Sequence, residues 1–116
     1  MDFKIYVDDE RPKPSDFDAL VRTNTQLEDL LYVLNKAGVQ VDTISFDHDN
    51  MYGPDFMMGL RSLPILGVWP ENLVFHTANP VAHKLMVAWA IEHAPMTTFV
   101  DPRYFYPMPP GIPEFG

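Results

Sequence analysis

Three short apolar segments of this chain run directly into polar residues whose side chains could do chemistry. Burying an unpaired carboxylate is costly, so acidic residues in this position should lie at strand ends and face solvent, a metal ion or a substrate. The segments and the residues that follow them are 3–7 with Asp8-Asp9, 44–46 with Asp47-His48-Asp49, and 73–75 with His76-Thr77-Ala78-Asn79.

The acidic pair Asp8-Asp9 is a candidate metal site, because hard oxygen donors suit Mg²⁺ or Mn²⁺. The alternative is a solvated turn, since Asp is common after strands. A second carboxylate cluster after another strand favours the functional interpretation. Alternation along an extended chain would let Asp47 and Asp49 converge while His48 points away.

Two histidines are candidate proton-transfer groups, because the pKa of imidazole lies near neutrality. His48 would act as an acid/base group or as support for the carboxylates beside it, unless the segment is only a turn with Asx hydrogen bonds. His76 is either a catalytic acid/base or a hydrogen-bonded core histidine.

The residues after the third polar segment could form an anion-binding site. Thr77 and the backbone amides of a following helix would make a cradle for phosphate. Asn79 would help to bind the phosphate, or it would serve only as the cap of that helix. Arg11 would either pair with the acidic edge or contact a ligand phosphate through two hydrogen bonds.

Length and composition restrict the class of protein. The 116 residues suffice for one domain with a hydrophobic core, and the absence of cysteine excludes thiolate chemistry and disulfides. A net charge of −8 argues against non-specific binding to nucleic-acid backbone. No apolar run is long enough to span a bilayer, and the N-terminus lacks a signal-peptide pattern, so we expect a cytoplasmic protein that does not bind membranes.

Short apolar strands alternate with helices, which predicts an α/β fold with an open, mostly parallel sheet. In such sheets ligands bind at the carboxyl ends of the strands, which brings the three polar segments to one edge. The expected strands are 3–7, 19–23, 41–46, 73–75 and 97–100.

Three helices are expected between these strands. The first begins at a capping box, residues 25–28, and ends near Gly38. The second begins near Gly53-Pro54-Asp55 and ends before Pro64. The third begins at Asn79-Pro80, runs to about Ala94 and should be well buried.

Val7-Asp8-Asp9-Glu10, Asp47 and Thr77-Ala78 together resemble the receiver domains of bacterial response regulators. The resemblance implies a three-layer, flavodoxin-like domain over residues 1–102. Composition sets residues 103–116 apart as a Pro- and aromatic-rich tail without periodicity, which would pack back across the domain or bind a protein partner. The chain departs from that pattern at Asp101-Pro102, where a receiver carries Lys-Pro. A Pro-rich segment also replaces the first crossover helix.

The sequence is more similar to the cyclic-phosphate-processing receiver domains, a receiver-like family of bacteria and phages. The resemblance covers about residues 3 to 95, and it implies metal-assisted hydrolysis of cyclic phosphates on nucleotides or RNA ends. It rests on Asp8-Asp9-x-Arg11-Pro12, Arg22-Thr23, Ser45-x-Asp47-His48-Asp49 and His76-x-Ala78-Asn79-Pro80.

The leading hypothesis is therefore a phosphoesterase that depends on Mg²⁺ or Mn²⁺ and acts on a small cyclic phosphate or nucleotide. Its expected metal ligands are Asp8, Asp9 and Asp47, its catalytic residues His48, His76 and Asp49, and its substrate-binding residues Arg11, Thr77 and Asn79. Two alternatives are a non-enzymatic module that binds a partner or senses a ligand, and a receiver phosphorylated on Asp47.

Overall fold

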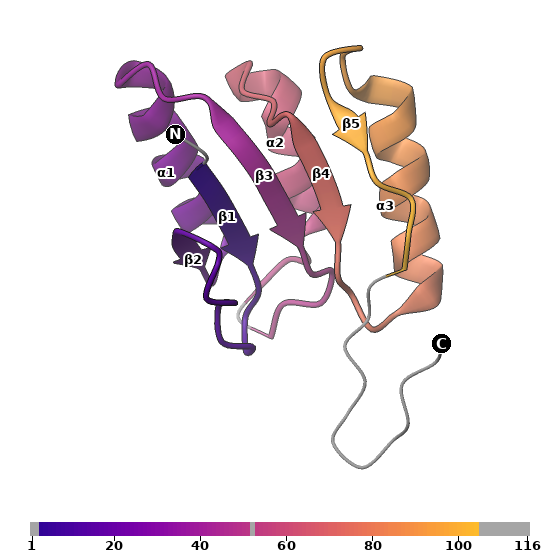
Figure 1. Cartoon of the computed structure of the whole chain (residues 1–116). Helices are drawn as coiled ribbons and strands as arrows, with labels where there is room; N and C mark the ends of the chain where they lie inside the picture. The colour runs from indigo at the N-terminus through magenta and orange to yellow at the C-terminus, as the bar shows by residue number, and fades with distance from the viewer. Residues whose placement is uncertain (1–2, 52, 105–116) are drawn as a thin grey trace.

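The computed structural model describes residues 3–51 and 53–104, which form a five-stranded sheet in the order β2-β1-β3-β4-β5. Every pair of neighbouring strands is parallel. The elements are β1 (Phe3–Val7), β2 (Ala19–Val21), α1 (Asn24–Lys36), β3 (Val41–Phe46), α2 (Met57–Leu66), β4 (Asn72–Phe75), α3 (Pro80–His93) and β5 (Phe99–Val100) (Figure 1).

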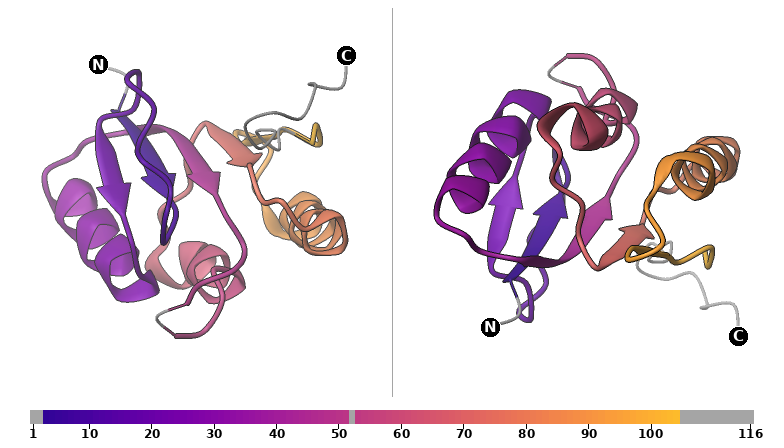
Figure 2. Two further views of the ribbon diagram at one scale, coloured as in Figure 1. Left: turned by 90° about the horizontal axis from the view of Figure 1, so that it is seen from below. Right: turned by 90° about the horizontal axis from the view of Figure 1, so that it is seen from above.

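The three helices of the described residues lie on one face of the sheet (Figure 2), and α2 packs against both α1 and α3. From β2 onward each connection moves in the same direction across the sheet, so right-handed crossovers place every helix on the same side. The connection from β1 to β2 runs the other way and contains Pro12 and Pro14 but no helix. The predicted receiver-like parallel sheet is confirmed, but the layering is wrong: the described chain has two layers, not three.

The hydrophobic core fills the space between the sheet and its helices. Strand side chains alternate between the two faces, so one set enters this core and the other set faces the side without helices. The fully buried core residues of the three central strands are Ile5, Val7, Ile44, Phe46, Leu73 and Phe75. Tyr6 and Ser45 belong to the other set, and the same alternation continues into Asp8 and Asp47.

Helix α1 begins at Asn24, and its cap, Thr23, lies two residues before the predicted cap, Thr25. The hydroxyl of Thr23 accepts a hydrogen bond from the N–H of Gln26, and the Gln26 side chain accepts one from the N–H of Arg22. Thr23 therefore caps the helix and shortens β2, which ends at Val21 instead of residue 23. The predicted stop is confirmed, because Gly38 has a φ of 71° and its N–H bonds the carbonyl of Asn35.

Helix α2 lies further along the chain than predicted. It begins at Met57, whose N–H bonds the carboxylate of Asp55, and it continues through Pro64 to Leu66. Gly67, with a φ of 69°, ends it. Pro64 removes one backbone N–H donor, but the residues after it keep the helical conformation. The prediction that Pro64 ends the helix is therefore wrong.

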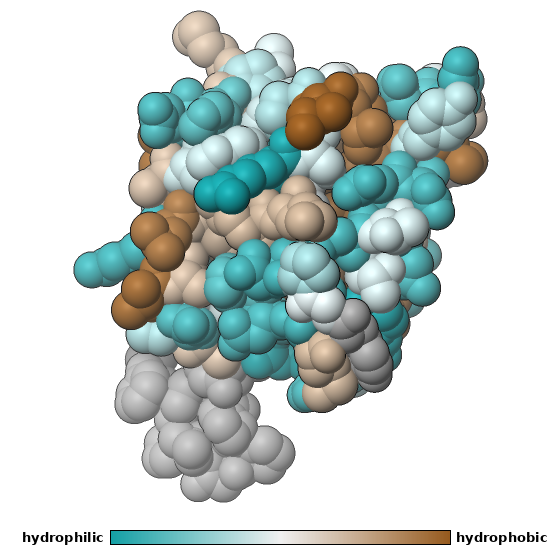
Figure 3. All heavy atoms as spheres, turned by 180° about the vertical axis from the view of Figure 1, so that it is seen from behind, coloured by the Kyte–Doolittle hydropathy of each residue, from teal (hydrophilic) through white to brown (hydrophobic). Residues whose placement is uncertain are grey.

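Helix α3 begins at Pro80 with Asn79 as its cap, as predicted, but it is not well buried. Only one stripe of the helix is buried, because the sheet and α2 cover it from one side. Val81, Leu85 and Ile91 are each more than 60% exposed. From the helix side of the molecule, apolar side chains form separate patches among hydrophilic ones (Figure 3). No helix in the described part of the chain is long and apolar enough to cross a bilayer.

The two threonines at the start of α1 provide a test of the observed cap. Thr23→Ala should lower the free energy of unfolding by about 1 kcal/mol, because it leaves the N–H of Gln26 without a partner. Thr25→Ala is the matched control: Thr25 is exposed within the first turn, and its loss should cost much less. Urea unfolding of both variants measures the difference. An equal cost for both would contradict the assigned cap.

Candidate active site at the carboxyl ends of the strands

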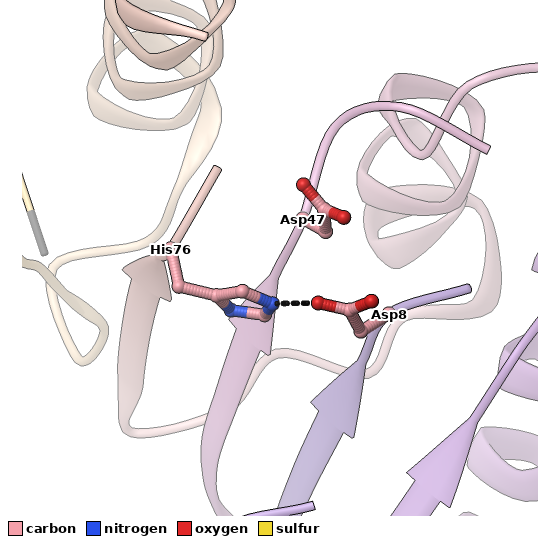
Figure 4. A group of neighbouring side chains, drawn as sticks. All are labelled: Asp8, Asp47 and His76. Atoms are coloured by element: carbon pink, nitrogen blue, oxygen red, sulfur yellow. Dashed lines mark hydrogen bonds and ion pairs between the residues drawn. The ribbon is translucent and has the colours of Figure 1, made fainter. Parts of the chain in front are cut away.

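Three polar side chains meet at the carboxyl ends of the central strands. Asp8, Asp47 and His76 directly follow β1, β3 and β4, and each offers one ligand atom within 4.8 Å of the others. The backbone hydrogen bonds of the parallel sheet continue into this region. The N–H of Asp47 donates to the carbonyl of Val7, and the N–H of His76 donates to that of Phe46, each at 2.8 Å. The side chains converge above the strand ends (Figure 4). The structure thus brings together one residue from each polar segment.

The carboxylate of Asp8 accepts hydrogen bonds on both oxygens. Its Oδ1 accepts from the backbone N–H groups of Glu10 and Arg11, each at 2.8 Å. Its Oδ2 accepts from Nη1 of Arg11 at 3.3 Å and lies 3.0 Å from Nε2 of His76. Burial acts to raise the pKa of Asp8, but the hydrogen bonds from His76, Arg11 and Glu10 outweigh it and lower the pKa to about 2.

Asp47 lies in the opposite electrostatic environment. It is 8% exposed and accepts one hydrogen bond, from the N–H of His48; no other side-chain hydrogen bond to it is found among the described residues. Burial raises the pKa of Asp47 to about 6, and the charges of Asp8 and Asp9 add to this effect. Two carboxylates of one site therefore have pKa values on opposite sides of the ordinary value.

His76 is almost completely buried, with an exposed fraction of 4%. Its ring stacks on Tyr6 with a centroid separation of 4.2 Å, and its Nδ1 lies 2.7 Å from the hydroxyl of Ser45. Burial lowers the pKa of His76, although Asp8 opposes the shift. Burial also raises the pKa of the Tyr6 hydroxyl to about 12, with a further contribution from Asp8.

A polar pocket of about 570 Å³ opens beside this cluster. Asp47 belongs both to the cluster and to the wall of the pocket, whereas Asp8 and His76 lie behind the wall. Asp9 also lines the pocket, and its carboxylate accepts a hydrogen bond from the N–H of Met51 at 2.9 Å. The other lining residues are Glu10, Arg11, His48, Asp49, Asn50, Met51, Gly53, Asp55 and Ala78.

His48 and Asp49 contact each other on this wall. Nδ1 of His48 lies 2.8 Å from the Asp49 carboxylate, and its Nε2 lies 3.5 Å from that of Asp55. The expected convergence of Asp49 with Asp47 is not found, because the alternation of β3 reaches Asp47 but does not continue to Asp49. Asp49, whose side chain is 74% exposed, turns instead toward the imidazole between them.

The predicted substrate-binding residues lie around the same end of the sheet. Arg11 lines the pocket while its guanidinium also contacts Asp8 and the carbonyl of His76. Asn79 caps α3 by accepting from the N–H groups of Val81 and Ala82. Thr77 is fully buried, and its hydroxyl accepts from the N–H of Asn79. The turn is therefore well ordered by its own hydrogen bonds, and its contact with a phosphate stays a prediction.

Three residues that support the site were not predicted as site residues. Tyr6 and Ser45 lie two positions before Asp8 and Asp47, on the same strand face, so the period of two is the signal that could have identified them. Arg22 donates to the carbonyls of Asp8 and Arg11 and fixes the loop between them. No local pattern predicts this contact, because it joins two different connections.

The position after β5 differs from a receiver in chemistry as well as in sequence. Asp101 is buried, and its carboxylate forms a two-pronged ion pair with Arg103, whose hydrogen bonds lower the pKa of Asp101. Tyr104 donates to the carbonyl of Ala78 beside the pocket. The predicted tail begins with these two residues, and positions 105–116 lie outside the described residues.

A parallel sheet in the order 2-1-3-4-5, with acidic residues after β1 and β3, defines a receiver-like domain. Residues 3–91 match the family model of the cyclic-phosphate processing receiver domain, and the chain belongs to that family. The resemblance carried by the sequence motifs is thereby confirmed. Comparisons with curated proteins and with solved structures give no match.

The raised pKa of Asp47 makes the stability of the metal-free protein depend on pH. Between the ordinary value of 3.8 and about 6, the folded state holds this proton more tightly than the unfolded chain, so the contribution of Asp47 to stability falls as pH rises. In EDTA, Asp47→Asn should therefore raise the free energy of unfolding at pH 7 by about 1–2 kcal/mol, after allowance for partial solvent screening.

The same substitution should have little effect near pH 3, where Asp47 is protonated in the folded state and mostly protonated in the unfolded chain. Urea unfolding at the two pH values measures the change. Asp49→Asn, which alters an exposed carboxylate next to it, is the control and should change stability by less than about 0.5 kcal/mol. A gain of equal size at both pH values would contradict the assigned pKa.

Proposed function

We propose that this domain is a metal-dependent phosphoesterase that hydrolyses a cyclic phosphate on a nucleotide or an RNA end. The observation that carries the proposal is the position of Asp47. Its carboxylate is shared between the buried Asp8–His76 cluster and the wall of a polar pocket large enough for a phosphate and part of a nucleoside. The membership in a cyclic-phosphate processing family supports the choice of substrate class.

The residues at the pocket fit a hard divalent cation. Carboxylate oxygens are the ligands that Mg²⁺ and Mn²⁺ prefer. Asp9 and Asp47 on the pocket wall would supply them, together with Asp8 next to Asp47. Asp47 accepts one hydrogen bond among the described residues, so its carboxylate has acceptor capacity left for a cation. Burial, and after it the charges of Asp8 and Asp9, raise the pKa of Asp47, and a bound cation would offset this cost of ionisation. A bound cation would polarise a phosphoryl oxygen and lower the pKa of a water molecule.

The reaction consumes one water per cyclic phosphate. The water oxygen forms a bond to phosphorus, one ring P–O bond breaks, and the leaving sugar oxygen takes up a proton, which yields a phosphomonoester. His48 or His76 would deliver that proton, and Asp49 would orient His48 or act as a base. Arg11 would hold phosphate oxygens, together with Thr77 and Asn79 at the start of α3.

The deciding experiment incubates the protein with Mg²⁺ or Mn²⁺ and either a panel of cyclic nucleotides or acetyl phosphate. We expect ring opening of at least one cyclic nucleotide, and no turnover in EDTA. Asp47→Asn should reduce kcat by at least about 10²-fold, because it removes the carboxylate on which the site centres. Asp29→Asn, an exposed change on α1, should leave kcat unchanged.

The other outcomes of this experiment identify the alternatives. A stable acyl phosphate on Asp47 after treatment with acetyl phosphate would point to a phosphoacceptor receiver. Absence of hydrolysis with every cyclic nucleotide would refute the proposal and favour a binding module. Full activity in Asp47→Asn would refute the assignment of the site.

Cation binding has a readout that needs no substrate. A cation that binds only the folded state raises stability, by about 2.7 kcal/mol at a hundredfold excess over Kd. We expect Mn²⁺ to raise the Tm of the wild-type protein and to leave that of Asp47→Asn unchanged. An equal rise in both proteins would place the cation elsewhere on this acidic chain.

A further inference from the structure

His76 is enclosed by partners on its ring face and at both ring nitrogens. One ring face stacks on Tyr6 at an interplanar angle of 7°. Nδ1 lies 2.7 Å from the Ser45 hydroxyl, and Nε2 lies 3.0 Å from Oδ2 of Asp8. His76 is not among the residues that line the pocket. Both nitrogens of this ring therefore already have partners within the protein, and neither belongs to the pocket wall.

The partners of Asp8 determine which nitrogen of His76 carries the proton. Asp8 is otherwise surrounded by donors: two backbone N–H groups on Oδ1 and the Arg11 guanidinium on Oδ2. A carboxylate held in this way acts as an acceptor toward the fourth partner as well. Nε2 of His76 must then be the N–H donor, which leaves Nδ1 as an acceptor. The hydroxyl of Ser45 is the group placed to donate to it.

We propose that Ser45 is a positioning residue, whose hydroxyl donates to Nδ1 of His76 and so holds the ring as a fixed Nε2–H donor to Asp8. The catalytic consequence of this inference rests on the proposed function, whereas the hydrogen bond itself does not. With both nitrogens engaged, His76 orients the Asp8 carboxylate beneath Asp47 and does not deliver a proton to the leaving oxygen. That step then belongs to His48.

The position of His48 agrees with this division of roles. It lines the pocket, its side chain is 20% exposed, and its two nitrogens face the exposed carboxylates of Asp49 and Asp55. Ser45, His76 and Asp8 also have the order of a nucleophilic triad, but Ser45 is only 2% exposed and does not line the pocket. The chain of hydrogen bonds therefore serves to hold a carboxylate, not to activate a serine.

The tautomer of His76 can be observed directly by NMR of the metal-free protein with ¹⁵N-labelled histidine. We expect one set of His76 ring signals, with a protonated Nε2 and an unprotonated Nδ1. The other histidines are His48, His83 and His93, and single Gln variants of each assign the spectrum. A protonated Nδ1 in the wild-type protein would overturn the proposal, whatever the variants do.

Substitutions at Ser45 test the consequence of the bond. Ser45→Ala should give a mixture of His76 tautomers and lower kcat about tenfold with little change in KM, the size expected for one lost hydrogen bond. Ser45→Thr keeps the hydroxyl and should restore both. Thr43→Val is the matched control, because it removes a hydroxyl from the same strand face, two residues away, where the partner is Asp42. A wild-type spectrum and kcat in Ser45→Ala would refute the role of Ser45.

Substrates with different leaving groups show which of the two histidines, His48 or His76, donates the proton. The deficit of His48→Gln should shrink on an aryl phosphate ester whose leaving group needs no proton, whereas that of Ser45→Ala should be the same for both leaving groups. A Ser45→Ala deficit that vanishes on the aryl ester would show that His76 is the proton donor and would overturn the proposal. If the wild-type protein lacks esterase activity, the proposed function fails, and the spectrum still decides the tautomer.

Discussion

The hydrogen bond between His76 and Asp8 joins the ends of β4 and β1, two strands that β3 separates in the sheet. Because this hydrogen bond passes over the end of β3, it holds the side chains of Asp8 and His76 in place beneath Asp47. The rest of the site depends on this pair. Arg11 and the N–H groups of its loop complete the hydrogen bonds of Asp8. Asp47 lies next to this charged carboxylate and accepts one hydrogen bond, so burial and then the charge of Asp8 raise its pKa.

The missing crossover helix has a direct consequence for this arrangement. In a doubly wound sheet a helix between β1 and β2 would cover the face that carries Tyr6 and Ser45. Here residues 10–18 replace it, and Phe17 packs edge-on against Tyr6 at 5.2 Å. A short row of rings, Phe17, Tyr6 and His76, thus takes the place of a helix, and it continues directly into the site. The ring of His76 is therefore supported by Tyr6 of β1, on the open face of the sheet, and not by a helix that covers this face.

Sequence patterns predicted the parts of the molecule that depend on local periodicity. The parallel strands, the cap at Asn79 and the convergence of strand ends all follow from side-chain alternation and fold class. The start of α1 was misplaced because Thr23 and Thr25 offer similar capping signals, and only the tertiary position of the chain selects between them. Pro64 was misjudged because the proline removes only its own backbone donor, and the chain keeps the helical conformation beyond it as far as Leu66.

The contacts within the site were harder to predict, because they join residues far apart in the sequence. His76 and Asp8 are 68 positions apart, and His76 and Ser45 are 31 apart. The motif contains residues that the structure brings together at one end of the sheet, but it could not show that His48 lines the pocket and that His76 does not. That difference depends on burial, which a single sequence does not encode locally.

The two central aspartates suggest why such a site would favour binding a cation over signalling. Asp8 already accepts four hydrogen bonds and does not line the pocket, whereas Asp47 does, so a cation or phosphate in the proposed site would meet Asp47 first. A phosphoryl group on Asp47 would add charge next to Asp8 and Asp9. After β5, where a receiver has lysine, Asp101 supplies a carboxylate whose charge Arg103 already balances. The described site thus lacks a lysine at the position where a receiver has one. A divalent cation held by the carboxylates would offset the same negative charges.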